Sequence, residues 1–188
     1  GAAVSTEVAT ASTVSEIQKI AVIAVLFLLV VLILTTTSWV EPFVVLIGLG
    51  VAVIINAGTN LIFGEISFVT NAAGNILQLA VSLDYSVFLI HRFDECRQNR
   101  KPQDAMRQAL CMSASSILSS GLTTVIGFLA LTLMRFRIGP DLGLALAKGI
   151  GISLLTVFLF MPGVILGTYQ WMDKTAHRSF LPSFRIFG

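Results

Sequence analysis

The chain of 188 residues is 55% hydrophobic and only 12% charged, with a formal net charge of +2. Soluble domains usually carry about twice that share of charged residues, so the composition argues against a water-soluble enzyme. The small net charge also gives no support for a nucleic-acid-binding protein.

Five apolar segments follow one another along the chain, at residues 20–39, 42–63, 69–91, 113–134 and 143–171. Each is long enough to cross a hydrocarbon core of about 30 Å, which takes about 20 helical residues. We therefore predict an all-α integral membrane protein, a bundle of five transmembrane helices. Pro162 lies inside the fifth segment and is expected to kink it, because proline lacks a backbone N–H and clashes with the preceding turn.

The polar segments divide the chain further. Residues 1–18 precede the first apolar segment without the pattern of a signal peptide, and the chain does not begin with methionine. We expect a piece of a longer protein, with residues 1–18 as the end of an extracytoplasmic region. Residues 19–172 then form the transmembrane domain, with a loop at 92–112, and residues 173–188 form a tail.

Basic residues predict the orientation. Five Lys or Arg residues lie in the 92–112 segment and three in the tail, whereas the opposite side of the bundle has three. The positive-inside rule then places this loop and the C-terminus in the cytoplasm and the N-terminus outside, in the plasma membrane. Within the loop, residues 104–112 are predicted to form a short interfacial helix.

Asp84 is the most informative residue of the chain, because it lies inside the third apolar segment. An aspartate at the centre of a membrane helix costs about 2.5 to 3.5 kcal/mol. It must therefore be protonated, paired or exposed to a wet cavity. One hypothesis makes Asp84 a carrier that takes up a proton on one side and releases it on the other. The alternative is a structural aspartate that a neighbouring helix satisfies.

A stripe of polar residues follows one face of the third segment and ends at Tyr85, next to Asp84. The stripe could line a hydrated path, with Asn75 and Gln78 as candidate lining residues. It could equally hold helices together through hydrogen bonds worth about 0.6 kcal/mol each. The stripe consists of Asn71, Asn75, Gln78, Ser82 and Tyr85.

Two further sites of interest lie in the fourth and fifth segments. The fourth carries a face of serine, threonine and glycine, for which close helix packing is the expected role. Thr123 and Thr124 on it are also candidate hydrogen-bond partners of Asp84. Lys148 in the fifth segment either extends to the interface along its four-carbon stem, acts on the outer half of a proton path, or faces a lipid headgroup.

Motifs of soluble catalysis are missing from the sequence. It contains no P-loop or dinucleotide fingerprint, and no nucleophile lies near a base. Cys96 and Cys111 have no CxxC spacing, and His91 and His177 have no metal-ligand companion nearby. We therefore expect no enzymatic activity, no cofactor and no metal site.

Three segments carry a resemblance to a known family. Residues 83–95, LDYSVFLIHRFDE, resemble the fourth-helix signature of the RND superfamily in its MMPL branch. Residues 120–131 are similar to the fifth helix of that family, and residues 141–149 to the start of the sixth. The resemblance implies that the five segments are helices two to six of one half of an RND-type transmembrane domain.

The same resemblance implies a function. It is the export of lipids or other hydrophobic compounds across a bacterial plasma membrane, driven by the proton-motive force. Asp84 and Tyr85 would be the proton-relay pair, facing the corresponding pair of a second half from the same chain or from a second copy. A lone half is not expected to transport. Two alternatives remain, a sterol- or lipid-sensing regulatory membrane domain and a passive membrane scaffold.

Overall fold

The computed structural model describes residues 2–36, 38–63, 68–135 and 138–176, and nearly all of this part is helical. The tail expected at 173–188 lies outside the described residues from position 177 onward. The all-α prediction is confirmed. The helices are α1 (Ala2–Thr35), α2 (Glu41–Phe63), α3 (Phe68–Arg97), α4 (Pro102–Ala130), η1 (Leu131–Leu133), α5 (Ile138–Leu155), η2 (Thr156–Phe160) and α6 (Met161–Lys174).

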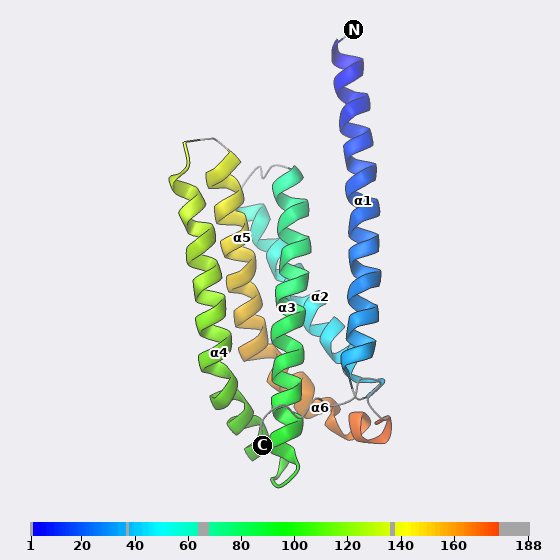
Figure 1. Cartoon of the computed structure of the whole chain (residues 1–188), viewed down its shortest axis with the longest axis vertical. Helices are drawn as coiled ribbons and strands as arrows, with labels where there is room; N and C mark the ends of the chain where they lie inside the picture. The colour runs from blue at the N-terminus through cyan, green and yellow to red at the C-terminus, as the bar shows by residue number, and fades with distance from the viewer. Residues whose placement is uncertain (1, 37, 64–67, 136–137, 177–188) are drawn as a thin grey trace.

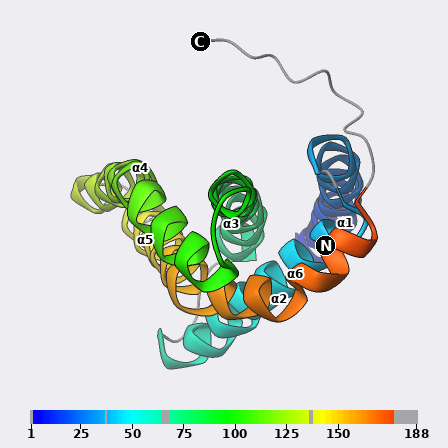
Figure 2. The same cartoon turned by 90° about the horizontal axis from the view of Figure 1, so that it is seen from below.

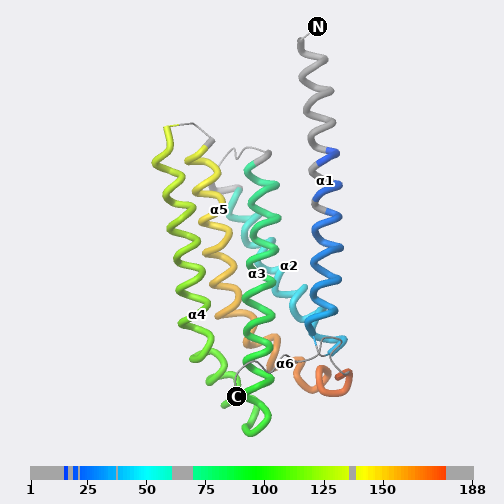
Figure 3. Tube along the Cα trace, viewed as in Figure 1, coloured from blue at the N-terminus to red at the C-terminus, as the bar shows by residue number. Residues whose placement is uncertain are grey.

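Helix α3 is the centre of the arrangement. It packs mainly against α4, α5 and α2, whereas α1 contacts α2 and α3 only sparsely. Seen along the bundle, α3 lies between α4 on one side and α1 on the other (Figures 1 and 2). The trace in Figure 3 shows α1 as the outermost helix on its side of the bundle. Most polar residues of interest therefore lie on a helix with neighbours on several sides.

Within the described residues, four helical stretches are long and apolar enough to cross a membrane. A shorter apolar stretch, Val22–Thr35, forms part of α1 and overlaps the first predicted span. The prediction of a membrane-spanning bundle is therefore confirmed. The four long stretches are Glu41–Asn60, Thr70–Arg97, Pro102–Leu133 and Gly139–Lys174.

The predicted interfacial helix at residues 104–112 is wrong as a separate element. The connection after α3 is limited to residues 98–101, and α4 then runs without a break from Pro102 to Ala130. Ala105, Met106 and Ala109 are buried in the protein core. The apolar face of an amphipathic helix can lie on a bilayer surface or pack against other helices. Here it packs against neighbouring helices.

Pro162 interrupts the fifth predicted span as expected. The α-helical hydrogen bonding of α5 ends at Leu155, the π-helical turn η2 follows, and α6 begins with Pro162 in its first turn. Proline cannot donate to the carbonyl one turn earlier, and a wider turn is one way to accommodate the freed group. Figure 1 shows that α6 runs in a different direction from α5.

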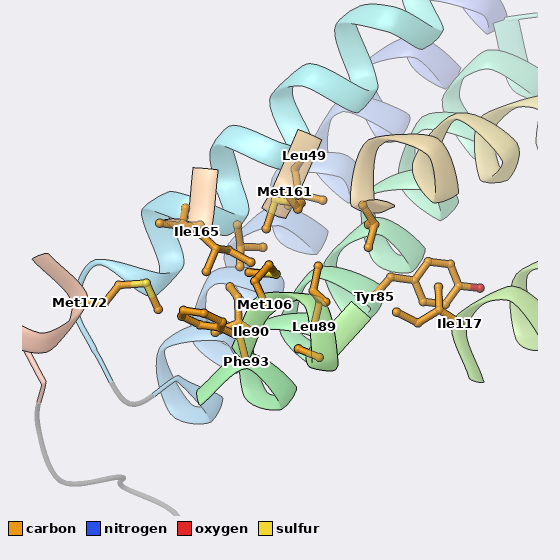
Figure 4. Packing of buried hydrophobic residues seen from close by; sticks show 14 of the residues in the cluster. Leu49, Tyr85, Leu89, Ile90, Phe93, Met106, Ile117, Met161, Ile165 and Met172 are labelled. Atoms are coloured by element: carbon orange, nitrogen blue, oxygen red, sulfur yellow. The ribbon is translucent and has the colours of Figure 1, made fainter. Parts of the chain in front are cut away.

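The hydrophobic core is densest near the α6 end of the bundle, where residues of α2, α3, α4 and α6 meet (Figure 4). Side chains with almost no exposed surface fill it. The core fixes the C-terminal end of α3, and with it the position of Asp84 nearer the middle of the same helix. Its members include Leu49, Leu89, Ile90, Phe93, Met106, Met161, Ile165 and Met172.

Candidate functional site

Asp84 lies in a groove between α3 and α4. The groove has a volume of about 170 Å³, and its α4 wall is formed by Ser116, Ile117 and Ser120. The Asp84 side chain is exposed and makes no hydrogen bond or ion pair within the described part of the chain. The carboxylate therefore faces outward from this bundle at a depth where its helix is apolar.

Tyr85 lines the same groove but belongs to the core. Its side chain is only 8% exposed and forms part of the buried hydrophobic cluster. Figure 4 shows its ring beside Ile117, with the hydroxyl directed away from the rest of the cluster. Successive residues of a helix point about 100° apart, which explains why Asp84 is exposed and its neighbour is buried. The two residues together form one site between α3 and α4.

Thr123 and Thr124 do not bond to Asp84, so this expectation is wrong. The Thr123 hydroxyl donates to Ser119 O at 2.7 Å, and the Thr124 hydroxyl donates to Ser120 O at 2.8 Å. Such bonds to the carbonyl four residues earlier are a common choice for threonine in apolar helices. The hydroxyl residues beside Asp84 are instead Ser120 and Ser116, about one and two turns earlier than Thr124 on the same helix.

The polar stripe of α3 is divided between different surroundings. Asn75 lines a separate, largely apolar groove of about 390 Å³ between α1 and α3. Gln78 is 1% exposed, and its Nε2 donates to Ala52 O of α2 at 3.0 Å. Neither residue lines the groove of Asp84 and Tyr85. Asn75 and Gln78 therefore lie in surroundings that differ from those of Asp84 and Tyr85.

Lys148 is held by α2. Its ammonium donates to Asn60 Oδ1 and, at 3.5 Å, to Asn56 O, and the side chain is half-buried. The side chain of this lysine therefore reaches from α5 to α2. It does not line the Asp84 groove.

An ionic cluster that sequence reasoning missed connects α3 with α6. Arg97 donates to both carboxylate oxygens of Asp173, at 2.6 and 2.9 Å, and lies 3.5 Å from Asp94. Its guanidinium also stacks over the rings of Phe93 and Tyr169. The partners are far apart in sequence, so no local pattern indicated the contact. We call it the α3–α6 clamp.

Metal-ligand clusters of three or more His, Cys, Asp or Glu side chains are not found among the residues that the structure describes. The Asp84 groove itself offers one carboxylate, one phenol and two serine hydroxyls. These groups can take up, hold and pass on a proton.

Comparison with known proteins identifies a family to which this chain is similar. The MMPL family model matches residues 1–184, almost the whole chain. No solved structure matches.

Several curated proteins match part of the chain. A protein of Methanocaldococcus jannaschii, named as a membrane protein, is 33% identical over 98 residues, which are 52% of this chain and 25% of that protein. A protein of Mycobacterium tuberculosis, named as transport protein MmpL12, is 29% identical over 138 residues, 71% of this chain and 12% of that protein. The mycolic acid-containing lipids exporter MmpL11 of Mycolicibacterium smegmatis is 28% identical over 99 residues, which are 52% of this chain and 10% of that protein. The chain spans about a quarter or less of the length of these relatives.

Proposed function

The chain belongs to the MMPL family, a branch of the RND superfamily, and on this basis we propose that it forms the transmembrane part of a proton-motive-force-driven exporter of lipids or other hydrophobic compounds. Asp84 and Tyr85 act as its proton-relay pair. The membrane bundle and the transport proteins among the relatives support the transporter role. The site supports the relay.

The exposed carboxylate of Asp84 carries this proposal. An ionised aspartate in an apolar helix is costly unless it meets water or a polar partner, and Asp84 has no partner among the described residues. Its groove opens at the surface of this bundle. A second transporter half, from the same protein or from a second copy, covers that face and places polar groups opposite Asp84.

The proposed transport cycle depends on the charge of the Asp84 carboxylate. Protonation of Asp84 from the outer side removes its charge and changes its contact with the second half, and release to the inner side restores both. Each proton that crosses with the membrane potential gains about 2.3 kcal/mol per 100 mV. Tyr85, whose ring is held in the core, supplies a fixed hydroxyl beside the moving proton.

We also propose a topology. The turn at residues 98–101 and the C-terminal tail lie in the cytoplasm, and the N-terminal part of α1 leads to an extracytoplasmic region, in the plasma membrane of a bacterium. The basic residues of the segment 92–112 support this orientation. Residues 1–18 form the end of the extracytoplasmic region in this proposal, and the transmembrane domain begins at residue 19.

A lipid-sensing regulatory domain is the second candidate function. The observation that favours it is the apolar groove of about 390 Å³ between α1 and α3, lined by residues such as Phe27, Leu28 and Leu79. A groove of this size and character suits a hydrophobic ligand. The same groove fits an exporter of lipids, so proton dependence is what separates the two functions.

The test is export by the full-length protein with Asp84→Asn, at matched membrane abundance. The amide keeps the size of the side chain but cannot exchange a proton, so export driven by a proton gradient should fall to background. Asp104→Asn, at an exposed position in the first turn of α4, is the control and should export normally. Normal export by Asp84→Asn would remove Asp84 from the mechanism. A lipid-dependent shift in thermal stability would then favour the sensor.

A further inference from the structure

A groove of about 660 Å³ lies at the turn between α3 and α4, at the same end of the bundle as α6 (Figure 1). The apolar stretch of α3 ends at Arg97 and that of α4 begins at Pro102. The turn that joins them, and the groove with it, therefore lie at the level of the lipid headgroups. We call this groove the turn groove. Its polar lining includes Arg100, Lys101 and Arg107.

The three cations of the turn groove have no ion-pair partner. The side chains of Arg100, Lys101 and Arg107 are exposed and form no salt bridge within the described part of the chain. Asp104 also lines the groove, but its carboxylate does not bind an anion. Three cations and one carboxylate leave a net charge of +2. Because like charges in one groove repel one another, a bound anion would lower the electrostatic energy.

Other arginines near this end of α3 have partners. Arg92 is paired with Glu95, and Arg97 is paired with Asp173. The positive-inside rule accounts for basic residues on this side of the membrane, whether they are paired or not. It does not account for three unpaired cations that line one groove. The turn groove therefore has the charge of an anion-binding site.

The side of α4 that lines the turn groove continues as an apolar surface. Leu118 and Leu122 follow Cys111 of the groove by about two and three turns, so the three residues share one side of the helix. Both leucines are exposed, at 41% and 52%. Ser116 and Ser120, which line the Asp84 groove, lie about 200° around the helix from Leu118. A second transporter half at the Asp84 groove would thus leave this apolar side facing lipid.

We propose that the turn groove binds the headgroup of an anionic phospholipid. The guanidinium groups of Arg100 and Arg107 donate to its phosphate oxygens, and Lys101 adds a third positive charge. The acyl chains lie along the leucines of α4, so one molecule matches both the charge and the apolar surface. The proposed topology assigns this lipid to the cytoplasmic leaflet. The site itself requires neither Asp84 nor transport, and the bound lipid is not the exported substrate.

Photocrosslinking tests the site in the full-length protein, purified and reconstituted in phosphatidylcholine vesicles. The probe is a phosphatidylglycerol with a photoreactive acyl chain, and its mole fraction is varied while crosslinks within α4 are mapped. We expect crosslinks at residues 108–122, half-maximal at a lower mole fraction than for a phosphatidylcholine probe with the same chain. Lys101→Gln combined with Arg107→Gln should raise that mole fraction about 10- to 25-fold, because each cation near an anionic lipid surface strengthens binding about five-fold.

The matched control removes the same charge outside the groove. Arg92→Gln combined with Lys174→Gln, near the same end of the bundle, should leave the half-maximal mole fraction nearly unchanged. Lys101→Arg combined with Arg107→Lys keeps both charges and should retain crosslinking within a few-fold. An equal loss in the control would mean diffuse attraction to the membrane surface and would overturn the site. Equal crosslinking by the two probes in the unaltered protein would do the same.

A competition experiment distinguishes a lipid headgroup from free phosphate. Inorganic phosphate should reduce the phosphatidylglycerol crosslinks no more than sodium chloride does at the same ionic strength, since both only screen the charges. Loss of the crosslinks with phosphate alone would assign the groove to a soluble phosphate, and the lipid proposal would be wrong. Export by the Lys101→Gln and Arg107→Gln double variant is measured in parallel. Lost lipid crosslinks with retained export would separate this site from the proposed proton relay.

Discussion

At the scale of single residues, one helical step separates two kinds of environment. Asp84 is exposed in the α3–α4 groove, whereas Tyr85 is almost fully buried beside Ile117. The rotation of about 100° per residue required that they face different directions. It did not determine that both would line one groove, because that depends on where α4 lies.

The hydroxyl residues of α4 give a prediction at this scale. Ser116→Ala combined with Ser120→Ala should lower proton-driven export several-fold, because these serines line the Asp84 groove. Thr123→Val combined with Thr124→Val should leave export nearly unchanged, because those hydroxyls already bond within α4. Export at matched membrane abundance is the measurement. The reverse ranking of the two double variants would contradict the assignment.

At the scale of elements, glycines decide how closely α4 and α5 approach. A Cβ at Gly143 of α5 would lie 2.5 Å from Phe128 O of α4, a backbone atom that cannot move aside easily. Gly139 and Gly143 are four residues apart, a spacing of small residues that allows helices to approach closely, and Gly143 lies at such a contact. Gly163 and Gly167 have the same spacing, but a Cβ at either position would meet nothing within 4 Å in the described structure.

Gly143→Ala is therefore expected to destabilise the bundle by about 1–3 kcal/mol, as overpacking does. The matched change is Gly127→Ala, also in a helix but with nothing within 4 Å, which should be neutral or stabilising by up to about 1 kcal/mol. Thermal midpoints of the full-length protein in detergent would compare the two. Equal midpoints would show that α4 and α5 do not approach as closely as described.

The α3–α6 clamp gives a second prediction for elements. Arg97→Lys keeps the charge but loses the paired hydrogen bonds to Asp173 and the stacking on Phe93 and Tyr169. We expect a loss of about 1 kcal/mol in the free energy of unfolding, because the pair is partly exposed. Arg92→Lys is the control, since the partners of Arg92 in the described part of the chain, Glu95 and Phe88, belong to its own helix. A similar loss of unfolding free energy in both variants would show that the α3–α6 clamp does not stabilise the bundle more than a contact within one helix.

At the scale of the whole molecule, the bundle presents Asp84 on an outer face. The long helices α4 and α1 lie on opposite sides of α3, and α4 has few buried residues (Figure 2). An exposed acidic residue among apolar side chains is unfavourable toward lipid. The arrangement therefore supports a second transporter half against the α3–α4 face, as the proposed function requires.

The proposed orientation can be measured on the full-length protein after Cys96 and Cys111 are replaced by serine. Asn99→Cys lies in the turn proposed to be cytoplasmic, and Arg135→Cys lies near the opposite end of α4. In intact cells, a membrane-impermeant maleimide should label the cysteine at position 135 at once and that at position 99 only after permeabilisation. The opposite pattern would invert the topology.

The sequence could predict the elements but not their neighbours. The apolar segments and Pro162 were confirmed, because segment length and the missing proline N–H act locally. The separate helix at 104–112 and the bonds from Thr123 and Thr124 to Asp84 were wrong. An amphipathic pattern does not reveal what its apolar face meets, and helical spacing does not give the axial offset between two helices.

By itself, the sequence determined that the chain is an apolar helical bundle with one costly carboxylate at membrane depth. Both follow from composition and from the short range of backbone hydrogen bonding. Only the tertiary structure decided that Ser116 and Ser120 lie beside Asp84 and that Gln78 and Lys148 meet α2. The reason is physical, since the rotation and offset of each helix come from packing against the others, and side chains far apart in sequence meet only once that packing is complete.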